Sequence, residues 1–261
     1  MLTILQPAND WVAAHANEGS WLARGLELAP WLGLALPALL VVRALVQHRR
    51  YRAVNVLTPA DLDALHEAVR AAERRTVGEI VPVVVERSDS HPQAALAAAL
   101  VFAFAVPMLG LGLLPWGEPQ WIVLAQLAGA LAGWLLARAL PGFARLFVSE
   151  ARATHVANEQ ALQEFTGLGL HRTAAESGVL VFVSLFERRV IVLGDRGIDA
   201  KVGAEHWKKV DEAVLAGVRA GSLRGGLVEG IRLAGGVLAE HFPSPDGGRN
   251  ELPDRVVVRA S

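Results

Sequence analysis

Two long runs without an ionisable side chain constrain this chain most. They are residues 94–114 (AALAAALVFAFAVPMLGLGLL) and residues 119–137 (PQWIVLAQLAGALAGWLLA). About 20 apolar residues in a helix span a hydrocarbon core of about 30 Å. Lipid favours the helix because unpaired backbone groups are too costly there. Trp116 and Trp121 flank the short link and fit an interfacial aromatic belt. The sequence therefore predicts a transmembrane hairpin over residues 94–140, with a buried helical hairpin of a water-soluble protein as the alternative.

A third hydrophobic segment lies in an N-terminal extension, residues 1–57. Residues 28–46 (LAPWLGLALPALLVVRALV) are apolar enough to be a candidate transmembrane helix, but two prolines interrupt them and Arg43 lies near their end. An arginine near a helix end can extend its charged group to the interface. The segment either spans the membrane or lies on it as an amphipathic helix.

Basic residues are concentrated on one side of the hydrophobic segments. Before the first segment, Arg24 is accompanied by the acidic residues Asp10, Glu18 and Glu27. The run His48-Arg49-Arg50-Tyr51-Arg52 follows the first segment, and Arg138 and Arg145 close the third, whereas the link at 115–120 carries only Glu118. Positive charge favours the cytoplasmic side. We expect the N-terminus and the link outside, and residues 48–92 and those after about 141 in the cytoplasm. No secretory signal peptide is expected, since no basic stretch precedes an apolar core at the N-terminus.

Composition excludes several classes of function. The net charge is −1, which gives no bulk attraction to nucleic acid. The chain has no cysteine, which excludes disulfides, thiolate catalysis and cysteine-ligated metal sites. No phosphate loop, dinucleotide fingerprint, serine nucleophile elbow or zinc-protease helix is present.

Outside the hydrophobic segments, helical and strand patterns alternate. Thr58, Pro59 and Asp61 predict a capped helix start. Pro82 favours an edge position or a bulge in its strand. Glu187, Arg188 and Arg189 form a turn that we expect to be solvated or to contact anionic headgroups. The expected elements are helices at 58–75, 142–169, 204–220 and 223–241, strands at 78–86, 178–185 and 189–194, and a Pro/Gly-rich tail at 244–261. This order predicts a small three-layer α/β/α domain with a mixed sheet, formed by residues 58–92 and 142–243 and interrupted by the hairpin.

Several motifs carry a resemblance to a known family. They are VGEIVPVVVERSD, GLHRTAAESGVLVFVSLFERRVIVLGDRGIDAKV, GLVEGI, LAEHFP and NELPD. Over residues 58–254 the chain resembles the TPM-domain family, and in particular the bacterial membrane-protein branch whose TPM domain contains a two-helix transmembrane insertion. The resemblance implies a multi-pass protein of the bacterial inner membrane with a cytoplasmic TPM-like domain. It also implies two functional themes, since acid-phosphatase activity and calcium binding are proposed for photosynthetic members associated with photosystem repair, and an animal member is similar to a receptor accessory subunit.

The chain departs from the family pattern in two places. Glu176-Ser177 replaces an Asn-Asn pair, and Arg196-Gly197-Ile198-Asp199 replaces an aromatic-Gly-Leu-Glu sequence. Both departures lie near the metal and phosphatase site proposed for the family.

Strand directions predict where polar side chains gather. If strand 189–194 is antiparallel to strand 178–185, and strand 79–86 is parallel to it, the loops at 169–177 and 195–201 share one end of the sheet with Glu79. We call this end the polar rim. Its expected members are Glu79, His171, Arg172, Thr173, Glu176, Asp195, Asp199 and Lys201.

The polar rim offers candidate chemistry. Asp195, Asp199 and Glu79 are candidate ligands for Ca²⁺ or Mg²⁺, although an aspartate that caps the helix near 204 is the structural alternative for the first two. His171 is a candidate acid or base. Arg172 is a candidate anion ligand, or a partner of Glu176 or Asp195 in an ion pair.

Two functions follow from these features. The first is a non-enzymatic accessory or assembly factor that binds another membrane protein through the rim or through the hairpin, where Gly129, Ala130, Ala132 and Gly133 permit close helix packing. The second is a divalent-metal-assisted phosphatase that uses Asp195, Asp199 and Arg172. The first is preferred because the rim has no evident nucleophile and no full ligand set. Partner, substrate and oligomeric state do not follow from the sequence.

Overall fold

The computed structural model describes residues 57–110, 119–244, 251–253 and 255–259. The candidate helix at 28–46 and most of the link at 115–120 lie outside these residues. The chain divides into two compact units, which are described separately: a helical unit that includes His91–Phe147, and an α/β unit formed by Gln47–Ser90 and Val148–Ser261.

The α/β unit contains a mixed sheet of four strands in the order β3-β2-β1-β4. β1 (Glu79–Val85) is parallel to β2 (Gly178–Ser184), and β2 is antiparallel to β3 (Arg189–Gly194). These three strands and their directions are as the sequence predicts. β4 (Val257–Arg259) pairs parallel with residues 83–85 of β1. The predicted tail at 244–261 therefore contributes a strand that the sequence interpretation missed.

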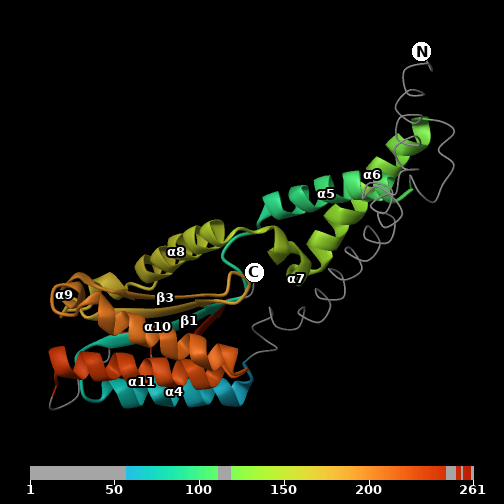
Figure 1. Cartoon of the computed structure of the whole chain (residues 1–261). Coiled ribbons are helices and arrows are strands. Elements are labelled where there is room, and N and C mark those ends of the chain that lie inside the picture. The colour runs from blue at the N-terminus through green and yellow to red at the C-terminus, as the bar shows by residue number, and fades with distance from the viewer. Residues whose placement is uncertain (1–56, 111–118, 245–250, 254, 260–261) are drawn as a thin grey trace, which may run out of the picture. The chain divides into compact units, whose positions relative to one another are not determined.

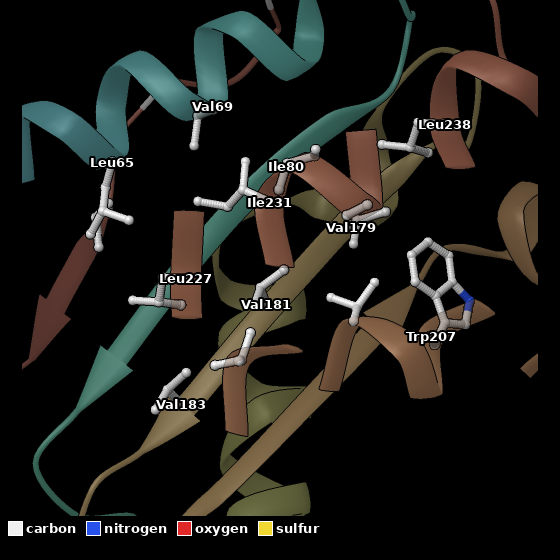
Figure 2. Packing of buried hydrophobic residues seen from close by; sticks show 14 of the residues in the cluster. Leu65, Val69, Ile80, Val179, Val181, Val183, Trp207, Leu227, Ile231 and Leu238 are labelled. Atoms are coloured by element: carbon white, nitrogen blue, oxygen red, sulfur yellow. The ribbon is translucent and has the colours of Figure 1, made fainter. Parts of the chain in front are cut away.

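Helices cover both faces of this sheet (Figure 1). One face packs against α4 (Pro59–Glu73), α10 (Ala204–Arg219) and α11 (Leu223–His241), and the other packs against α8 (Glu150–Gly167). Figure 2 shows the first of these cores, in which Val181 of β2 lies among Leu227 and Ile231 of α11. Because both faces are covered, every residue of β1 and β2 is buried. This explains why both strands are continuous apolar runs.

Local signals determine where two helices begin. Thr58 caps α4 through its side chain, and Asp61 completes the predicted capping box. The long helix predicted over residues 142–169 is instead divided into α7 (Pro141–Ala144), the 3₁₀ turn η2 (Arg145–Phe147) and α8. Ser149 has an extended backbone and accepts a hydrogen bond from the Arg152 N–H, so a new helix begins at Glu150. The serine N-cap overrides the continuous helical pattern.

Glycines bring α10 and α11 into close contact. A Cβ atom on Gly226 would lie 2.5 Å from the Val214 carbonyl oxygen, and one on Gly217 would collide with the backbone of Gly226. A Cβ atom on Gly230 would lie 2.5 Å from the Val214 side chain. The glycines of α11 therefore permit close helix packing.

The helical unit contains α5 (Pro92–Gly110) and α6 (Pro119–Ala139), two helices long and apolar enough to cross a membrane. Gly129, Gly133 and Ala137 form the buried stripe of α6. A Cβ atom on Gly133 would lie 2.5 Å from the Ala98 carbonyl oxygen of α5, so these glycines hold the two helices together. Gly129 and Gly133 are thus used within the hairpin and are not available for a separate partner.

Most of the large apolar side chains described in the hairpin are exposed, although Phe102 of α5 is buried beside Phe143. Leu100, Phe104 and Met108 of α5 and Leu127 of α6 are each 62–65% exposed. α6 therefore buries small residues and exposes large ones, the reverse of the arrangement in the α/β unit, while α5 buries Ala98 and Phe102 and exposes its other large side chains named above.

Candidate functional site

The polar rim forms at the predicted end of the sheet. Glu79 opens β1 opposite Gly178, the first residue of β2. The Asp195 N–H, just after β3, donates to the Gly178 carbonyl oxygen at 2.9 Å. Glu79 and Asp195 therefore lie on either side of the same residue of β2, and both are buried.

Glu79 is bound to the C-terminal segment. Its Oε1 accepts a hydrogen bond of 2.9 Å from the Glu251 N–H. The Glu251 side chain in turn accepts a hydrogen bond of 3.0 Å from the Ala174 N–H in the loop before β2. Glu251 of the motif NELPD thus docks onto the rim and joins two of its elements. The sequence interpretation left open whether this segment docks onto the domain or engages a partner.

Asp195 caps a short helix. Its Oδ1 accepts from the Arg196 N–H at 2.8 Å and begins α9 (Arg196–Asp199). Asp195 is therefore a helix cap, but it caps α9 and not, as was expected, the helix near residue 204. That helix, α10, begins at Ala204 and has Gly203 as its N-cap. The Oδ2 atom of Asp195 is buried and has no hydrogen-bond partner among the described residues. This oxygen is the feature of the rim best suited to bind a ligand.

The remaining predicted site residues do not join this hydrogen-bonded group. His171 and Arg172 lie on the exposed 3₁₀ turn η3 (Leu170–Arg172). Within the described ranges, Arg172 makes no ion pair with Glu176 or Asp195. Lys201 lies over the Phe242 ring, 4.3 Å from its centroid. The side chain of Asp199 lies outside the part of the chain that the structure describes.

The two loops of the rim touch through a glycine. A Cβ atom on Gly197 would lie 2.6 Å from the carbonyl oxygen of Glu176, a residue with a left-handed backbone (φ 48°). The two segments that depart from the family pattern therefore meet in space. Among the described side chains, no group of three or more histidine, aspartate or glutamate residues is arranged to hold a metal ion.

A buried carboxylate lies at the opposite end of the sheet. Glu187, which we expected to be solvated, is fully buried. Its oxygens accept from the Ser88 N–H at 3.0 and 3.1 Å and from the Ser184 hydroxyl. The expectation was wrong because the Glu187 carboxylate is used inside the domain, where it accepts the backbone N–H of Ser88 just after β1. Glu187 thereby attaches the segment that leads to α5 to the β2–β3 turn.

One ionisable side chain outside the rim has a strongly shifted pKa. Burial, and secondarily the charge of Glu212, raise the pKa of Asp211 in α10 to about 6. Its Oδ1 atom is buried without a hydrogen-bond partner among the described residues. Asp211 was not a predicted site residue, since a single aspartate on an amphipathic helix gives no signal of burial.

Comparison with known proteins supports the fold. The chain is similar to the NMR structure of BA42 protein from the psychrophilic bacterium Bizionia argentinensis, with a TM-score of 0.51 and 20% sequence identity. The match covers 80% of this chain and 99% of that one. The α/β unit has a TPM-like fold. No family model matches the chain, and the search of curated proteins finds no match. At this identity the likeness concerns the fold alone.

Proposed function

We propose that this chain is a multi-pass protein of the bacterial inner membrane whose α5–α6 hairpin lies in the lipid and whose TPM-like unit is a cytoplasmic binding domain for another membrane protein. The observation that carries the proposal is the inverted distribution of apolar side chains in α6. A core helix of a water-soluble protein buries its large side chains. Here the buried stripe of α6 is Gly129, Gly133 and Ala137, while Leu127 is 62% exposed.

The physical reason is the difference between lipid and water. In lipid, burying a leucine between helices brings no hydrophobic gain, so small residues form the helix contacts and large ones face the chains of the lipid. In water, a contiguous surface of this kind is a liability for aggregation. The aromatic and basic residues near the end of α6 also fit an interface, since the Arg138 guanidinium lies 5.0 Å from the centroid of the Trp134 ring.

The order of the chain supports a single cytoplasmic domain. β1 precedes the hairpin and β2 follows it, yet the two strands are paired over their whole length. An even number of spans between them returns the chain to the side from which it left. The α/β unit can therefore fold on one side of the membrane, which the basic flanks suggest is the cytoplasm.

Labelling of single cysteines tests this topology. Because the chain has no cysteine, Gln120→Cys and Arg219→Cys each provide one reactive thiol at an exposed position. A membrane-impermeant maleimide added to spheroplasts should label position 120, whereas position 219 should react only after permeabilisation. Equal labelling of both thiols, or release of the protein from membranes by carbonate at high pH, would contradict the proposal.

The binding role is preferred to catalysis because the rim is occupied by the chain itself. Glu79 is hydrogen-bonded to the C-terminal segment, and Asp195 caps α9. We propose that this rim, with Glu251 docked onto it, is a recognition surface. A test is a binding measurement between the purified chain and membrane proteins cross-linked to it in cells, with Glu251→Ala as the variant that loosens the docked segment. Unchanged binding in that variant would remove the rim from the interface.

The alternative function is a divalent-metal-assisted phosphatase, and the unpaired Oδ2 of Asp195 is the observation that favours it. A metal bound only by the folded state must raise the melting temperature. We expect no shift in the detergent-purified protein on addition of Ca²⁺ or Mg²⁺. A shift that is lost in Asp195→Asn, together with hydrolysis of a phosphate monoester, would instead establish the phosphatase. Asn retains a side-chain oxygen for the helix cap, so this variant separates metal binding from folding.

A further inference from the structure

Two histidines that are far apart in the chain meet at the open end of the α10–α11 pair. The two helices are antiparallel, and their contacts run away from the connecting turn: Gly217 lies against Gly226, and Val214 against Gly230. The same register places the first turn of α10 beside the last turn of α11. His206 and His241 occupy these two turns, and their ring centres are 6.1 Å apart, with the ring planes at 88° to each other.

The histidine pair lies at the same end of the sheet as the polar rim, but on the helices that cover one face. His241 is followed by Phe242, whose carbonyl oxygen accepts a hydrogen bond of 3.1 Å from the Val77 N–H, just before β1. Both imidazole rings are partly exposed, so solutes can reach them. Neither histidine is among the predicted site residues.

The backbone determines which nitrogen of His206 carries the proton. Its Nδ1 atom lies 3.3 Å from the carbonyl oxygen of Gly203. A carbonyl oxygen can only accept a hydrogen bond, so this contact requires the proton on Nδ1. The Nε2 atom of the neutral ring then carries a lone pair. Histidines that bind metals in proteins commonly have this arrangement, in which one ring nitrogen donates to a carbonyl group and the other is the ligand.

The second histidine has a nitrogen whose hydrogen-bonding capacity is not used within the domain. The Nε2 atom of His241 is buried and has no hydrogen-bond partner among the described residues. Buried polar atoms nearly always have a partner, so an exception of this kind requires an explanation. A direct hydrogen bond to His206 does not provide it, since none joins the two rings. A ligand bound between the rings does provide one.

The spacing of the rings fits a shared metal ion. A metal about 2.1 Å from an imidazole nitrogen lies about 3.2 Å from the ring centre, so two rings on one metal have centres at most about 6.4 Å apart, and about 5.2 Å apart in a tetrahedral site. The observed 6.1 Å lies inside this limit, and a small rotation of one partly exposed ring gives the tetrahedral spacing. The glycine contacts hold the two helices that carry the rings.

We propose that His206 and His241 bind a divalent transition-metal ion of the zinc class. Imidazole nitrogen suits Zn²⁺, Ni²⁺ and Cu²⁺, whereas Ca²⁺ and Mg²⁺ prefer oxygen ligands of the kind that the polar rim offers. Two protein ligands are fewer than the four of a structural zinc site, so water completes the coordination and binding is reversible. The metal joins the start of α10 to the end of α11. The proposal goes beyond the binding role of the rim and holds whether or not the hairpin lies in lipid.

Metal titration of the full chain tests this site. The protein is purified in detergent without a histidine tag, treated with a chelator, and titrated calorimetrically with Zn²⁺ well below its melting temperature. We expect one Zn²⁺ per chain, and an affinity that falls by about tenfold or more in His206→Ala and in His241→Ala, since even the loss of an outer partner of a metal ligand costs that much. Electron paramagnetic resonance of the protein loaded with one Cu²⁺ should show coupling to two imidazole nitrogens.

His155→Ala is the matched control, because it removes an exposed histidine of α8 that lies 3.4 Å from Glu159. This variant should bind Zn²⁺ as the wild type does. The melting temperature of each metal-free variant checks that it folds, and Zn²⁺ should raise that temperature only where both histidines are present. No binding of Zn²⁺ by the wild type, binding that is unchanged in both His206→Ala and His241→Ala, or equal affinity for Mg²⁺ would each overturn the proposal.

Discussion

Two pairs of antiparallel helices in this molecule use the same packing device and differ in where their large side chains lie. α5–α6 and α10–α11 are both held together by glycines whose missing Cβ atoms allow contact with the neighbouring backbone. In α11 the large residues Leu227, Ile231 and Leu238 are fully buried against the sheet. In α6, Leu127 and Leu131 are 62% and 58% exposed. Glycine-mediated contact is therefore common to both helix pairs. The two pairs differ in whether their large side chains are buried against other elements or exposed.

The largest expected effect compares matched leucine substitutions in the two pairs. Leu227→Ala removes a fully buried side chain and should destabilise the α/β unit by about 3 kcal/mol, through lost burial and the cavity that remains. Leu127→Ala, in the hairpin, should leave the unfolding of that unit unchanged, because the side chain is exposed. Urea unfolding in detergent, followed by near-ultraviolet circular dichroism, measures both. A comparable loss in Leu127→Ala would indicate that the hairpin is part of a water-soluble core.

A smaller effect is expected at two glycines of α11. A Cβ atom on Gly226 meets the Val214 carbonyl oxygen at 2.5 Å, so Gly226→Ala should push α10 and α11 apart and cost about 2 kcal/mol. Gly236 has no neighbour within 4 Å of an added Cβ atom, and Gly236→Ala should stabilise the helix by up to about 1 kcal/mol. Opposite signs of the two changes in melting temperature are the expected result. Equal signs would show that helix propensity, and not the contact between helices, governs this pair.

The smallest effect is expected at Asp211 of α10. The hairpin offers no counterpart, because residues 94–114 and 119–137 contain no carboxylate. The pKa of Asp211 is raised to about 6 in the folded state, so the folded protein binds more protons than the unfolded chain between about pH 4 and 6. Stability from this group therefore falls as the pH rises through that window. Asp211→Asn removes the buried charge and should be more stable than the wild type at pH 7.5, by about 1 kcal/mol after allowance for partial exposure.

The control for this prediction is the same comparison in acid. Toward about pH 3, below both the folded and the unfolded pKa, Asp211 becomes protonated in both states, so the advantage of the asparagine variant should disappear. Melting temperatures of the two proteins from pH 3 to 8 provide the measurement. A difference that does not vary with pH would mean that the substitution acts through packing.

Much of the α/β unit follows from local patterns. The capped start of α4 at Thr58, the continuous apolar runs of β1 and β2, and their pairing were predicted because capping and burial leave a periodic signal within a few residues. The break before Glu150 was missed although Ser149 provides a local signal, since the surrounding pattern is helical on both sides. The candidate site was predicted in part: Glu79 and Asp195 do flank Gly178, whereas His171 and Arg172 remain exposed on their turn.

The sequence by itself determined the two apolar helices, the alternation of helices and strands, and the end of the sheet at which polar residues collect. These features depend on composition and on periods of two or about 3.6 residues, which a single chain displays directly. Only the tertiary structure decided that Glu251 docks onto Glu79, that residues 257–259 join the sheet and that Glu187 is buried. Each of these depends on groups far apart in the chain, whose pairing is selected by the packing of the whole domain and leaves no local pattern.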